Sequence, residues 1–467
     1  MRIPVVGPSY VMDSKSFDSQ RSINLYPLIS ESGTSKSPTA LKKCPGYLLY
    51  QTAGGGPIRG AISTSDGRAF VVSGNTLYEV TTTGTTSRGT LNSATGRVCI
   101  AENGDQVMIV DGVDGYIFTQ STNGFAEIAD ADFPAASMVV YLDGYFIVNK
   151  LASAAFYISA LNDGTSWDAL DFAVVSSNPD DLIGLVADRG NLWLFGNRSV
   201  EVFDNTGAAS FPFERIDGSI IPTGCEATFT IMRIDNAIVW LGVDENGRGV
   251  VWKSSGYNAV RISTQAIEKR ISESTRRSQS YAWVYHQQGH AFLCLHVTDL
   301  DTTLVYDFTT RQWHERSHKN TTLNIREQHR ASCHFVFDNK NLIGDRESGK
   351  IYDLSLSYYD DNGEEMIWER TFAHIDDEKK IVSHRSLTLD CEVGTVTDDS
   401  EPMVMMKYSD DGGHTFSDEL THTLGKQGEY DLIVEFRRLG ISRDRVYHLA
   451  GSSNAPFQLN SGYLNVA

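Results

Sequence analysis

The stretch GDQVMIVDGVDGYIFT, at residues 104–119, contains an apolar segment, a turn and a second apolar segment. The run VMIV is followed by DGVDG and then by YIF, so the turn between the two segments is rich in Gly and Asp. Val, Ile and aromatic residues favour strands, whereas Gly and Asp favour tight turns. The stretch therefore predicts two antiparallel strands joined by a hairpin turn.

Six further stretches share this pattern, and each places an aromatic residue in its second strand. Their spacing of roughly 35 to 45 residues matches the period of four-stranded blades. Because one blade buries only part of its apolar faces, the blades must stack around a ring. The sequence therefore predicts an all-β protein with a β-propeller of seven blades at residues 57–357. The seven stretches are residues 67–80, 104–119, 142–159, 189–204, 235–254, 288–315 and 339–354, with aromatics at Tyr78, Phe118, Tyr157, Phe203, Trp252, Tyr306 and Tyr352.

Two regions lie outside the predicted ring. Residues 1–56 are rich in Ser, Pro and Gly, and we expect an extended N-terminal arm that gains its order by packing on a neighbouring subunit or another protein; disorder is the alternative. After YYDDNGEE, at residues 358–365, the chain shows longer alternating strands. This change of pattern predicts a C-terminal β-sandwich domain at residues 358–467.

One stretch has helical periodicity. In STQAIEKRISEST, at residues 263–275, Ser263 or Thr264 can cap the N-terminus, and Ile267 and Ile271 share a face at a spacing of four residues. We expect a short helix there.

The charge balance restricts the function. Lys and Arg number 40 against 59 Asp and Glu, which gives a formal net charge of −19. A surface this acidic repels phosphate, so sequence-specific DNA binding is disfavoured. A surface past which DNA slides without adhering remains compatible with this charge.

Membrane insertion and secretion are not indicated either. No segment approaches the roughly 18 uninterrupted apolar residues of a membrane helix. The start, MRIPVVGPSYVMDSKSFDS, lacks the basic flank and apolar stretch of a signal peptide. The six cysteines are widely spaced, so we expect buried thiols in a reducing compartment. They are Cys44, Cys99, Cys225, Cys294, Cys333 and Cys391.

One short motif points toward carbohydrate chemistry. SDDGGHTF, at residues 409–416, resembles the Asp-box of sialidases and other β-propeller proteins. In this motif the Asp and Thr side chains fix a turn, and Gly supplies a backbone conformation that other residues reach only at a cost. The chain offers no accompanying arginine cluster or Tyr and Glu pair. We therefore interpret the motif as a structural turn formed by Ser409, Asp411, Gly413, Thr415 and Phe416.

A metal site is also not indicated. Cys294 and His296 would project from one face of a strand, near His286 and His290, and a metal could use them together with Cys333 and His334. The spacing matches no zinc signature, and Phe292 beside Cys294 suggests a packed blade strand. With no nucleophile elbow, phosphate loop or nucleotide fingerprint, the sequence predicts no catalytic residues, metal or cofactor, and a protein that is not an enzyme.

Several stretches together resemble one family. They are QRSINLYPLISESG (20–33), ALKKCPGYLLY (40–50), ALNDGTSWDALDFA (160–173), NLWLFGNRSVEVFDNTGAASFPFERIDG (191–218), GCEATFTIMRIDNAIVWLG (224–242), RISTQAIEKRI (261–271), YSDDGGHTFSDE (408–419) and LGKQGEYDLIVEFRRLGISRDRVYHL (424–449). This set is similar to the packaged-DNA stabilisation proteins, or tail hub proteins, of short-tailed phages of the Salmonella podovirus type. One departure is Phe416, where the family pattern suggests Trp.

The resemblance implies a structural protein of the virion tail, present in the host bacterial cytoplasm during assembly. It implies a homo-hexameric ring below the portal and adaptor (the head-to-tail connector), which stabilises packaged DNA and extends the ejection channel. Double-stranded DNA would pass through the lumen without sequence-specific binding. Tailspikes or tail fibres and a plug or needle would dock on the ring, and no catalytic residue, cofactor or membrane insertion is implied.

A basic segment is the candidate interface. FRRLGISRDRVYHL, at residues 436–449, concentrates charges at Arg437, Arg438, Arg443, Asp444 and Arg445. These groups could pair with acidic groups of a neighbouring subunit. The alternative is an ion-pair network inside the predicted sandwich.

Two other functions compete with the hub. A propeller that binds or hydrolyses glycans is favoured by the Asp-box motif and by Trp167 and Trp313, aromatics that we expect to be exposed. A cellular scaffold that recruits a protein partner through its propeller face is the third hypothesis.

Overall fold

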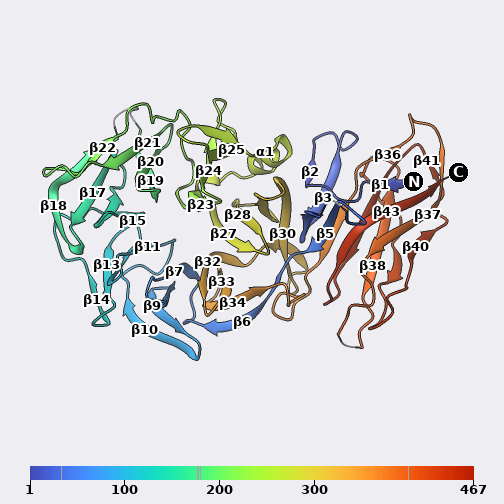
Figure 1. Ribbon diagram of the computed structural model, residues 1–467, viewed down its shortest axis with the longest axis horizontal. Helices are drawn as coiled ribbons and strands as arrows, with labels where there is room; N and C mark the ends of the chain where they lie inside the picture. Colours follow the sequence, from blue (N-terminus) through green and yellow to red (C-terminus); the bar gives the residue numbers. More distant parts are fainter. Residues whose placement is uncertain (33, 176–177, 179, 398, 467) are drawn as a thin grey trace.

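A β-propeller and a β-sandwich lie side by side along the long axis of the molecule, and both chain ends lie in the sandwich (Figure 1). The computed structural model describes residues 1–32, 34–175, 178, 180–397 and 399–466. The all-β fold class, with a propeller followed by a C-terminal sandwich, is confirmed.

Six separate four-stranded antiparallel sheets form blades of the propeller. The first blade contains β7 (Ile58–Ser63), β8 (Ala69–Ser73), β9 (Thr76–Thr81) and β10 (Gly84–Thr90), and the second contains β11 (Cys99–Glu102), β12 (Gln106–Val110), β13 (Gly115–Thr119) and β14 (Gly124–Glu127). The third contains β15 (Val139–Leu142), β16 (Tyr145–Asn149), β17 (Ala155–Ala160) and β18 (Asp163–Val174), and the fourth contains β19 (Leu182–Asp188), β20 (Asn191–Gly196), β21 (Val200–Asn205) and β22 (Phe213–Arg215). The fifth contains β23 (Met232–Ile234), β24 (Ala237–Val243), β25 (Gly249–Ser254) and β26 (Ala259–Arg261).

The sixth separate blade closes the ring with a strand from the N-terminal region. It contains β32 (Ala331–Phe337), β33 (Lys340–Asp345), β34 (Lys350–Ser355) and β6 (Gly46–Thr52). Inner strand β32 contacts β7 of the first blade, so the last and first blades meet. The hydrogen bonds between β34 and β6 therefore close the ring, although almost the whole sequence of the propeller separates these two strands.

One expected blade is not a separate sheet. The strands β27 (Tyr281–Gln287), β28 (His290–His296), β29 (Thr303–Asp307) and β30 (Gln312–Asn320) occupy the remaining place in the ring. The edge of β30 is paired by β3 (Ser19–Ile23), and through β3 the four strands continue into a 12-stranded sheet. The blade count therefore differs from the predicted seven: among the described residues six blades are separate four-stranded sheets, whereas β27–β30 belong to a larger sheet because β3 pairs with the edge of β30.

The described part of residues 1–56 contains six strands that pair with this chain, whereas we expected an extended arm that packs on a neighbouring subunit or another protein. β1 (Arg2–Ile3) pairs with β43 (Gln458–Val466), and β2 (Tyr10–Val11) pairs with β3. β4 (Leu25–Ile29) and β5 (Thr39–Lys43) join the sandwich, whereas β6 joins the propeller. This region therefore connects the two domains of its own chain.

The sandwich encloses one apolar core between two sheets. One sheet has the order β4-β5-β43-β37-β40, and the other continues from β3 through β35-β42-β38-β39. Core residues come from both sheets, and the rings of Trp368 and Phe457 stack with centroids 3.9 Å apart. The remaining strands are β35 (Trp368–Thr371), β36 (Ile375–Asp376), β37 (Val382–Cys391), β38 (Met403–Ser409), β39 (Leu420–Thr423), β40 (Val434–Arg437), β41 (Ile441–Ser442) and β42 (Asp444–Gly451).

Short helical turns sit on the propeller. The expected helix is confirmed as α1 (Gln265–Ser272), whose N-terminus is capped by the Thr264 side chain and whose Ile267 and Ile271 are buried. Two 3-10 turns, η1 (Thr228–Thr230) and η2 (Arg277–Gln279), and the strand β31 (Ile325–Gln328) complete the described elements. Among the residues that the structure describes, no helix has the length and hydropathy that crossing a bilayer requires.

All six cysteines are free thiols, although the sequence predicts that all six are buried. Three are buried and three are partly buried. Burial raises the pKa of Cys44 and of Cys225 to about 12, so both stay protonated at neutral pH.

Candidate functional site

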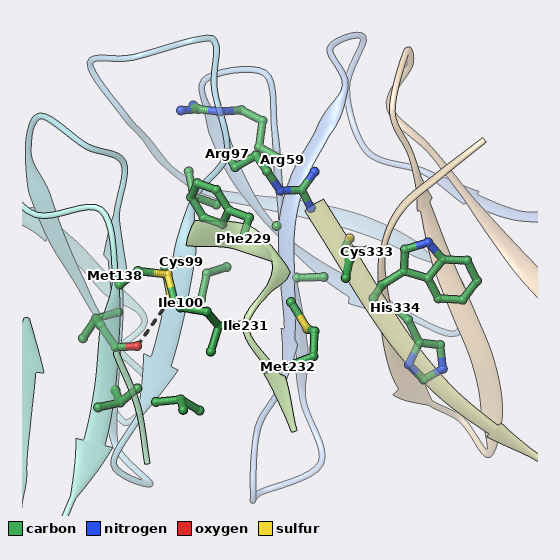
Figure 2. Close-up of a pocket in the computed structure, with 18 of the residues that line it drawn as sticks. Arg59, Arg97, Cys99, Ile100, Met138, Phe229, Ile231, Met232, Cys333 and His334 are labelled. Atoms are coloured by element: carbon green, nitrogen blue, oxygen red, sulfur yellow. Dashed lines mark hydrogen bonds between the residues drawn. The ribbon is translucent and has the colours of Figure 1, made fainter. Parts of the chain in front are cut away.

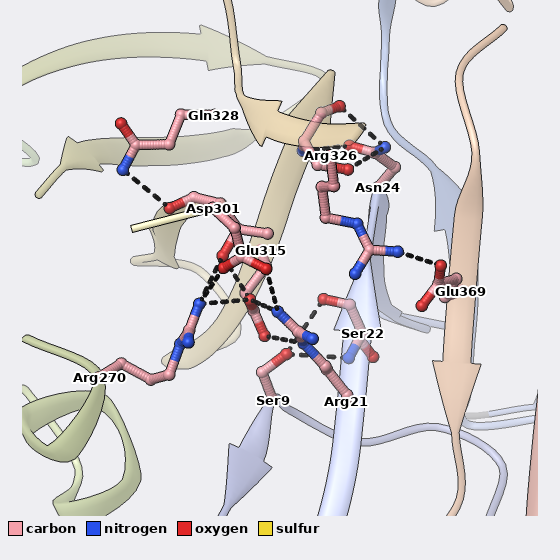
Figure 3. A network of polar contacts seen from close by, with 12 residues as sticks. Ser9, Arg21, Ser22, Asn24, Arg270, Asp301, Glu315, Arg326, Gln328 and Glu369 are labelled. Carbon is pink, nitrogen blue, oxygen red and sulfur yellow. Dashed lines mark hydrogen bonds and ion pairs between the residues drawn. The ribbon is translucent and has the colours of Figure 1, made fainter. Parts of the chain in front are cut away.

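Strand β3 joins the two domains, and a buried carboxylate lies beside it (Figure 3). β3 pairs with β30 of the propeller at Ile23 and Glu315, and with β35 of the sandwich at Arg21 and Thr371. This register places Arg21 against Glu315. The Arg21 guanidinium donates two hydrogen bonds to the carboxylate, from Nε to Oε1 at 2.9 Å and from Nη2 to Oε2 at 2.7 Å.

Helix α1 adds a second arginine to this site. Arg270 donates to Asp301 and lies 3.9 Å from the Glu315 carboxylate. The Thr302 hydroxyl donates to the same carboxylate at 2.6 Å. Arg21 and Arg270 therefore link β3 and α1 to the Glu315 carboxylate of β30, and Arg270 also pairs with Asp301 and Glu273.

The cluster changes the acidity of Glu315. Burial by itself raises the pKa of this carboxyl group, but the charge and hydrogen bonds of Arg21, together with the Thr302 hydroxyl and Arg270, outweigh it and lower the pKa to about 2. Glu315 is 3% exposed, so this carboxylate is a buried charge that depends on its partners.

Neighbouring polar contacts reinforce the junction. The Asn24 amide donates to the backbone oxygens of Ser317 at 3.1 Å and of Ile367 at 2.7 Å, so it spans the two domains. Arg326 of β31 forms an ion pair with Glu369 of β35. These contacts favour one rigid body over two domains joined by a hinge.

A buried arginine also holds the first residues of the chain. Arg370 of β35 donates to the Val5 oxygen at 2.7 Å, to Gln20 Oε1 at 2.7 Å and to Ser22 Oγ at 3.1 Å. Burial lowers the pKa of Arg370 to about 9. The N-terminal segment therefore supplies the acceptors that this buried side chain needs.

Sequence reasoning missed this junction. Arg21 and Glu315 are 294 positions apart, and the stretches that contain them, residues 20–33 and 288–315, carry no signal that would pair the two side chains. Only the register of β3 between two sheets brings them together.

Two residues of the predicted interface have partners within the sandwich, with Arg445 buried and Asp444 partly buried. The Arg445 side chain is 1% exposed and donates to the Asp410 carboxylate at 2.6 and 2.8 Å and to the Leu439 oxygen. Asp444 accepts from His374 Nδ1 and Lys379 Nζ, both at 2.8 Å. Arg445 and Asp444 therefore have partners in their own chain, in agreement with the alternative of an internal ion-pair network.

The other three predicted residues are exposed and form what we call the arginine edge. Arg437 is paired with Glu435 but is 76% exposed, and Arg443 donates to the Lys379 oxygen at 2.8 Å. The Arg438 side chain has no hydrogen bond or ion pair with any described residue. Ile441, between them in the chain, is 63% exposed. The arginine edge is thus a basic surface with an apolar residue, at the sandwich end of the molecule.

The Asp-box-like motif forms the turn that follows β38. The Asp411 carboxylate accepts hydrogen bonds from the backbone N–H of His414 and from the N–H and hydroxyl of Thr415, and the Ser409 hydroxyl accepts from Gly413 N at 2.8 Å. The hydroxyls of Thr415 and Ser409 hold the pKa of Asp411 well below its usual range. Phe416 lies 5.6 Å from the His448 ring and stays partly exposed. The side chains of Ser409, Asp411 and Thr415 serve the turn itself, whereas Asp410 pairs with Arg445. The tryptophans expected to be exposed for glycan binding, Trp167 and Trp313, are buried.

The histidine and cysteine cluster is separated by packing. His290 Nδ1 is 2.8 Å from Asp307, whereas the His296 ring stacks on Tyr281 at 4.3 Å. Cys294 is fully buried between them in the strand. Within the described ranges, no group of three or more His, Cys, Asp or Glu side chains could hold a metal ion.

Two family models match the chain. One, described as bacteriophage P22 Gp10, beta-propeller, matches residues 1–359, and the other, bacteriophage P22 Gp10, beta-sandwich, matches residues 367–467. No curated protein is significantly similar to the chain.

Solved structures match the chain at low sequence identity. The extracellular domain of a putative one-component system from B. thetaiotaomicron is 10% identical with a TM-score of 0.43, and the match covers 67% of this chain and 40% of that one. YCF48 bound to D1 peptide is 13% identical with a TM-score of 0.40 over 68% and 99% of the two chains. The N-terminal domain of Nup159 is 12% identical with a TM-score of 0.42 over 72% and 99%.

Replacing Glu315 with Gln should destabilise the protein in a way that depends on pH. A folded pKa of about 2 against an ordinary value of 4.5 corresponds to about 3 kcal/mol of stability above pH 4.5, which is lost as the pH falls toward 2. Urea unfolding at a series of pH values should therefore show a gap between wild type and Glu315→Gln that is largest at pH 7 and narrows below pH 4.5. Glu365→Gln, at a more exposed ion pair with Lys319, is the matched control and should change stability by less than about 0.5 kcal/mol. A stability gap that does not change with pH would contradict the lowered pKa of Glu315.

Two neighbouring arginines should differ sharply in their effect on stability. Arg445→Ala leaves Asp410 and the Leu439 oxygen without their donor and should lower the free energy of unfolding by about 3 kcal/mol. Arg443→Ala, on the exposed arginine edge, should change it by less than about 0.5 kcal/mol. Chemical denaturation of both variants measures the difference. Equal losses of unfolding free energy would contradict the burial of Arg445 and the exposure of Arg443.

Proposed function

Because the chain belongs to the family of bacteriophage P22 Gp10, with the propeller and the sandwich of that family, we propose that it forms the tail hub of a short-tailed phage. The family makes it a structural protein of P22-type phage tails. In the proposal, copies of the chain, six in number, form a ring below the portal and adaptor, stabilise the packaged DNA and extend the ejection channel. Tailspikes or fibres and a plug or needle dock on this ring, which is assembled in the host cytoplasm. The match of both family models, in order along the chain, is the observation that carries the proposal.

The junction supports a mechanical role. A ring around a DNA channel must keep its shape under the pressure of a packed genome. The shared strand β3, the buried cluster at Glu315 and the Asn24 bridge join the two domains at many points. A subunit with this junction can act as a stiff wall element.

The charge supports a conduit for DNA. A net charge of −19 repels phosphates, so the genome can leave without adhering to the wall. Salt screens this repulsion beyond about 8 to 10 Å, so only carboxylates close to the DNA contribute.

The far end of the propeller offers a surface complementary to the arginine edge. β18 is the last strand of its sheet, so its outer edge is unpaired among the described residues. Opposite Tyr157 and Ser159 of β17 its register shifts, so residues 168–171 bulge outward. Leu170 is 80% exposed, and Asp168 is exposed beside it. We call residues 168–174 the β18 edge; it is apolar and acidic.

The two surfaces favour a head-to-tail contact between copies. The β18 edge and the arginine edge of β40–β42 lie at opposite ends of the molecule (Figure 1). Pairing the β18 edge with itself would place aspartates against aspartates, and pairing the arginine edge with itself would place arginines against arginines. A contact between unlike ends avoids both repulsions, and head-to-tail contacts close into rings when the rotation permits.

The hub proposal predicts protection of packaged DNA. Purified protein should bind DNA-filled heads that carry portal and adaptor but lack this component, because the ring closes the exit of the genome. Nuclease digestion measures the protected fraction, and electron microscopy shows whether a ring is gained at one vertex. If the heads stay sensitive to nuclease and never bind the protein, the hub proposal is wrong. Glycan arrays would then test the alternative of a glycan-binding propeller.

The head-to-tail contact predicts a charge-swap pattern. Asp168→Arg with Asp171→Arg, or Arg438→Glu with Arg443→Glu, should each abolish ring formation and DNA protection on heads, since like charges then meet. An equimolar mixture of the two variants should restore both, because alternating copies again present opposite charges. Glu245→Arg, at an exposed loop outside both edges, is the control and should assemble as wild type. If the wild type protects DNA and the two variants do so equally well, the contact is wrong while the hub stands.

A further inference from the structure

A cavity of about 350 Å³ lies at the centre of the propeller (Figure 2). Its walls come from the first strands of the blades and from η1, so it lies where the blades converge. Most of the lining is apolar. Its lining includes Arg59, Ala61, Arg97, Phe229, Cys333 and His334.

The charge of this cavity is one-sided. Its lining includes two arginines and neither Asp nor Glu. Arg59 is fully engaged, because its guanidinium donates to the oxygens of Gly74, Ser93, Thr95 and Gly96 at 2.7 to 2.9 Å. The Ser93 hydroxyl, which also accepts from Arg59, donates to a carboxylate at Asp111, so an acid lies close to this arginine.

Arg97 has no such compensation. It donates one hydrogen bond, from Nη2 to the Ser332 oxygen at 2.5 Å, and lies 3.9 Å from the Tyr281 ring centroid and 5.6 Å from that of Phe229. No carboxylate contacts it in the part of the chain that the structure describes. A guanidinium has five N–H donors, so most of those of Arg97 are left for another partner. In a chain with 59 acidic residues, this uncompensated charge stands out.

The other polar groups of the lining do not supply a negative charge. Burial lowers the pKa of His334 to about 4, so its imidazole is neutral at pH 7. Burial also raises the pKa of the Cys333 thiol, which therefore stays protonated. The cavity thus presents the uncompensated charge of the partly buried Arg97 among neutral and apolar groups, and such a charge is stabilised by an opposite partner.

We propose that this cavity binds a small organic carboxylate, with the carboxylate on Arg97 and an apolar body against the inner strands of the blades. The planar guanidinium matches a carboxylate with two parallel hydrogen bonds. The apolar walls offer few donors for the remaining oxygens of a phosphate or sulfate, so a monoanion with an apolar body fits better. The volume lies at the lower end of the range of about 300 to 1,000 Å³ for ligand pockets, which limits the ligand to a small molecule. This site is independent of the proposed hub.

The test compares charged probes with neutral probes of the same shape on the full chain. Benzoate and hexanoate should bind, seen by saturation-transfer NMR and a raised unfolding temperature, whereas benzamide and hexanamide should bind at least about tenfold more weakly. Inorganic phosphate should bind more weakly than benzoate. Equal binding of acids and amides, equal binding of phosphate, or no binding of any acid would overturn the proposal.

Two variants locate the binding. Arg97→Met should weaken benzoate binding by roughly tenfold to a hundredfold, because it removes the charged donor. Ala61→Phe should do the same by filling the cavity while leaving Arg97 in place. Arg88→Met, which removes an arginine paired with Glu79 outside the cavity, is the matched control and should bind benzoate as wild type. Unchanged binding in both cavity variants would place the ligand elsewhere and reject the site.

Discussion

The pairing of β3 with both domains is the constraint on which the architecture depends. On one side β3 continues the sheet of β27–β30, and on the other it continues the sheet of β35 and β42. Because backbone hydrogen bonds fix the register, the same strand places Arg21 over Glu315 and brings Asn24 to the two facing backbones. Once Glu315 is buried there, Arg21, Arg270 and Thr302 must stay in place, since an unpaired buried carboxylate is costly.

The repeats and local motifs of the chain were predictable because their signals are short in sequence. Each predicted hairpin falls on a strand pair, such as β12 and β13 for residues 104–119, since alternation and turn residues act within about 16 positions. The helix at α1 follows from its Thr264 cap and two isoleucines, and the turn at Asp411 follows from side chains two to four positions apart. Local chemistry of this kind is independent of the rest of the fold.

The junction between the domains and the burial of each arginine could not be predicted, because both depend on contacts between segments that are distant in sequence. The merging of one blade into a 12-stranded sheet, and the partners of Arg21, depend on strands that are hundreds of positions apart. Within RRLGISRDR, Arg443 precedes β42 and stays exposed, whereas Arg445 lies in β42 with its side chain against Tyr408 and Asp410. Composition marks such a segment as basic, but only the strand boundary and the facing sheet decide which arginine is buried.

The overall charge has a further consequence for the proposed ring. Copies that each carry −19 repel one another at long range, yet this repulsion is screened beyond about 8 to 10 Å at physiological salt. Ion pairs between the β18 edge and the arginine edge act at contact distance, where screening is weaker, and the exposed Leu170 and Ile441 add apolar area that salt does not weaken. Low salt should therefore oppose ring closure in free solution. A portal and adaptor would hold neighbouring copies in place and so offset the long-range repulsion between them. The contacts between the β18 edge and the arginine edge would then set how the copies are arranged in the ring.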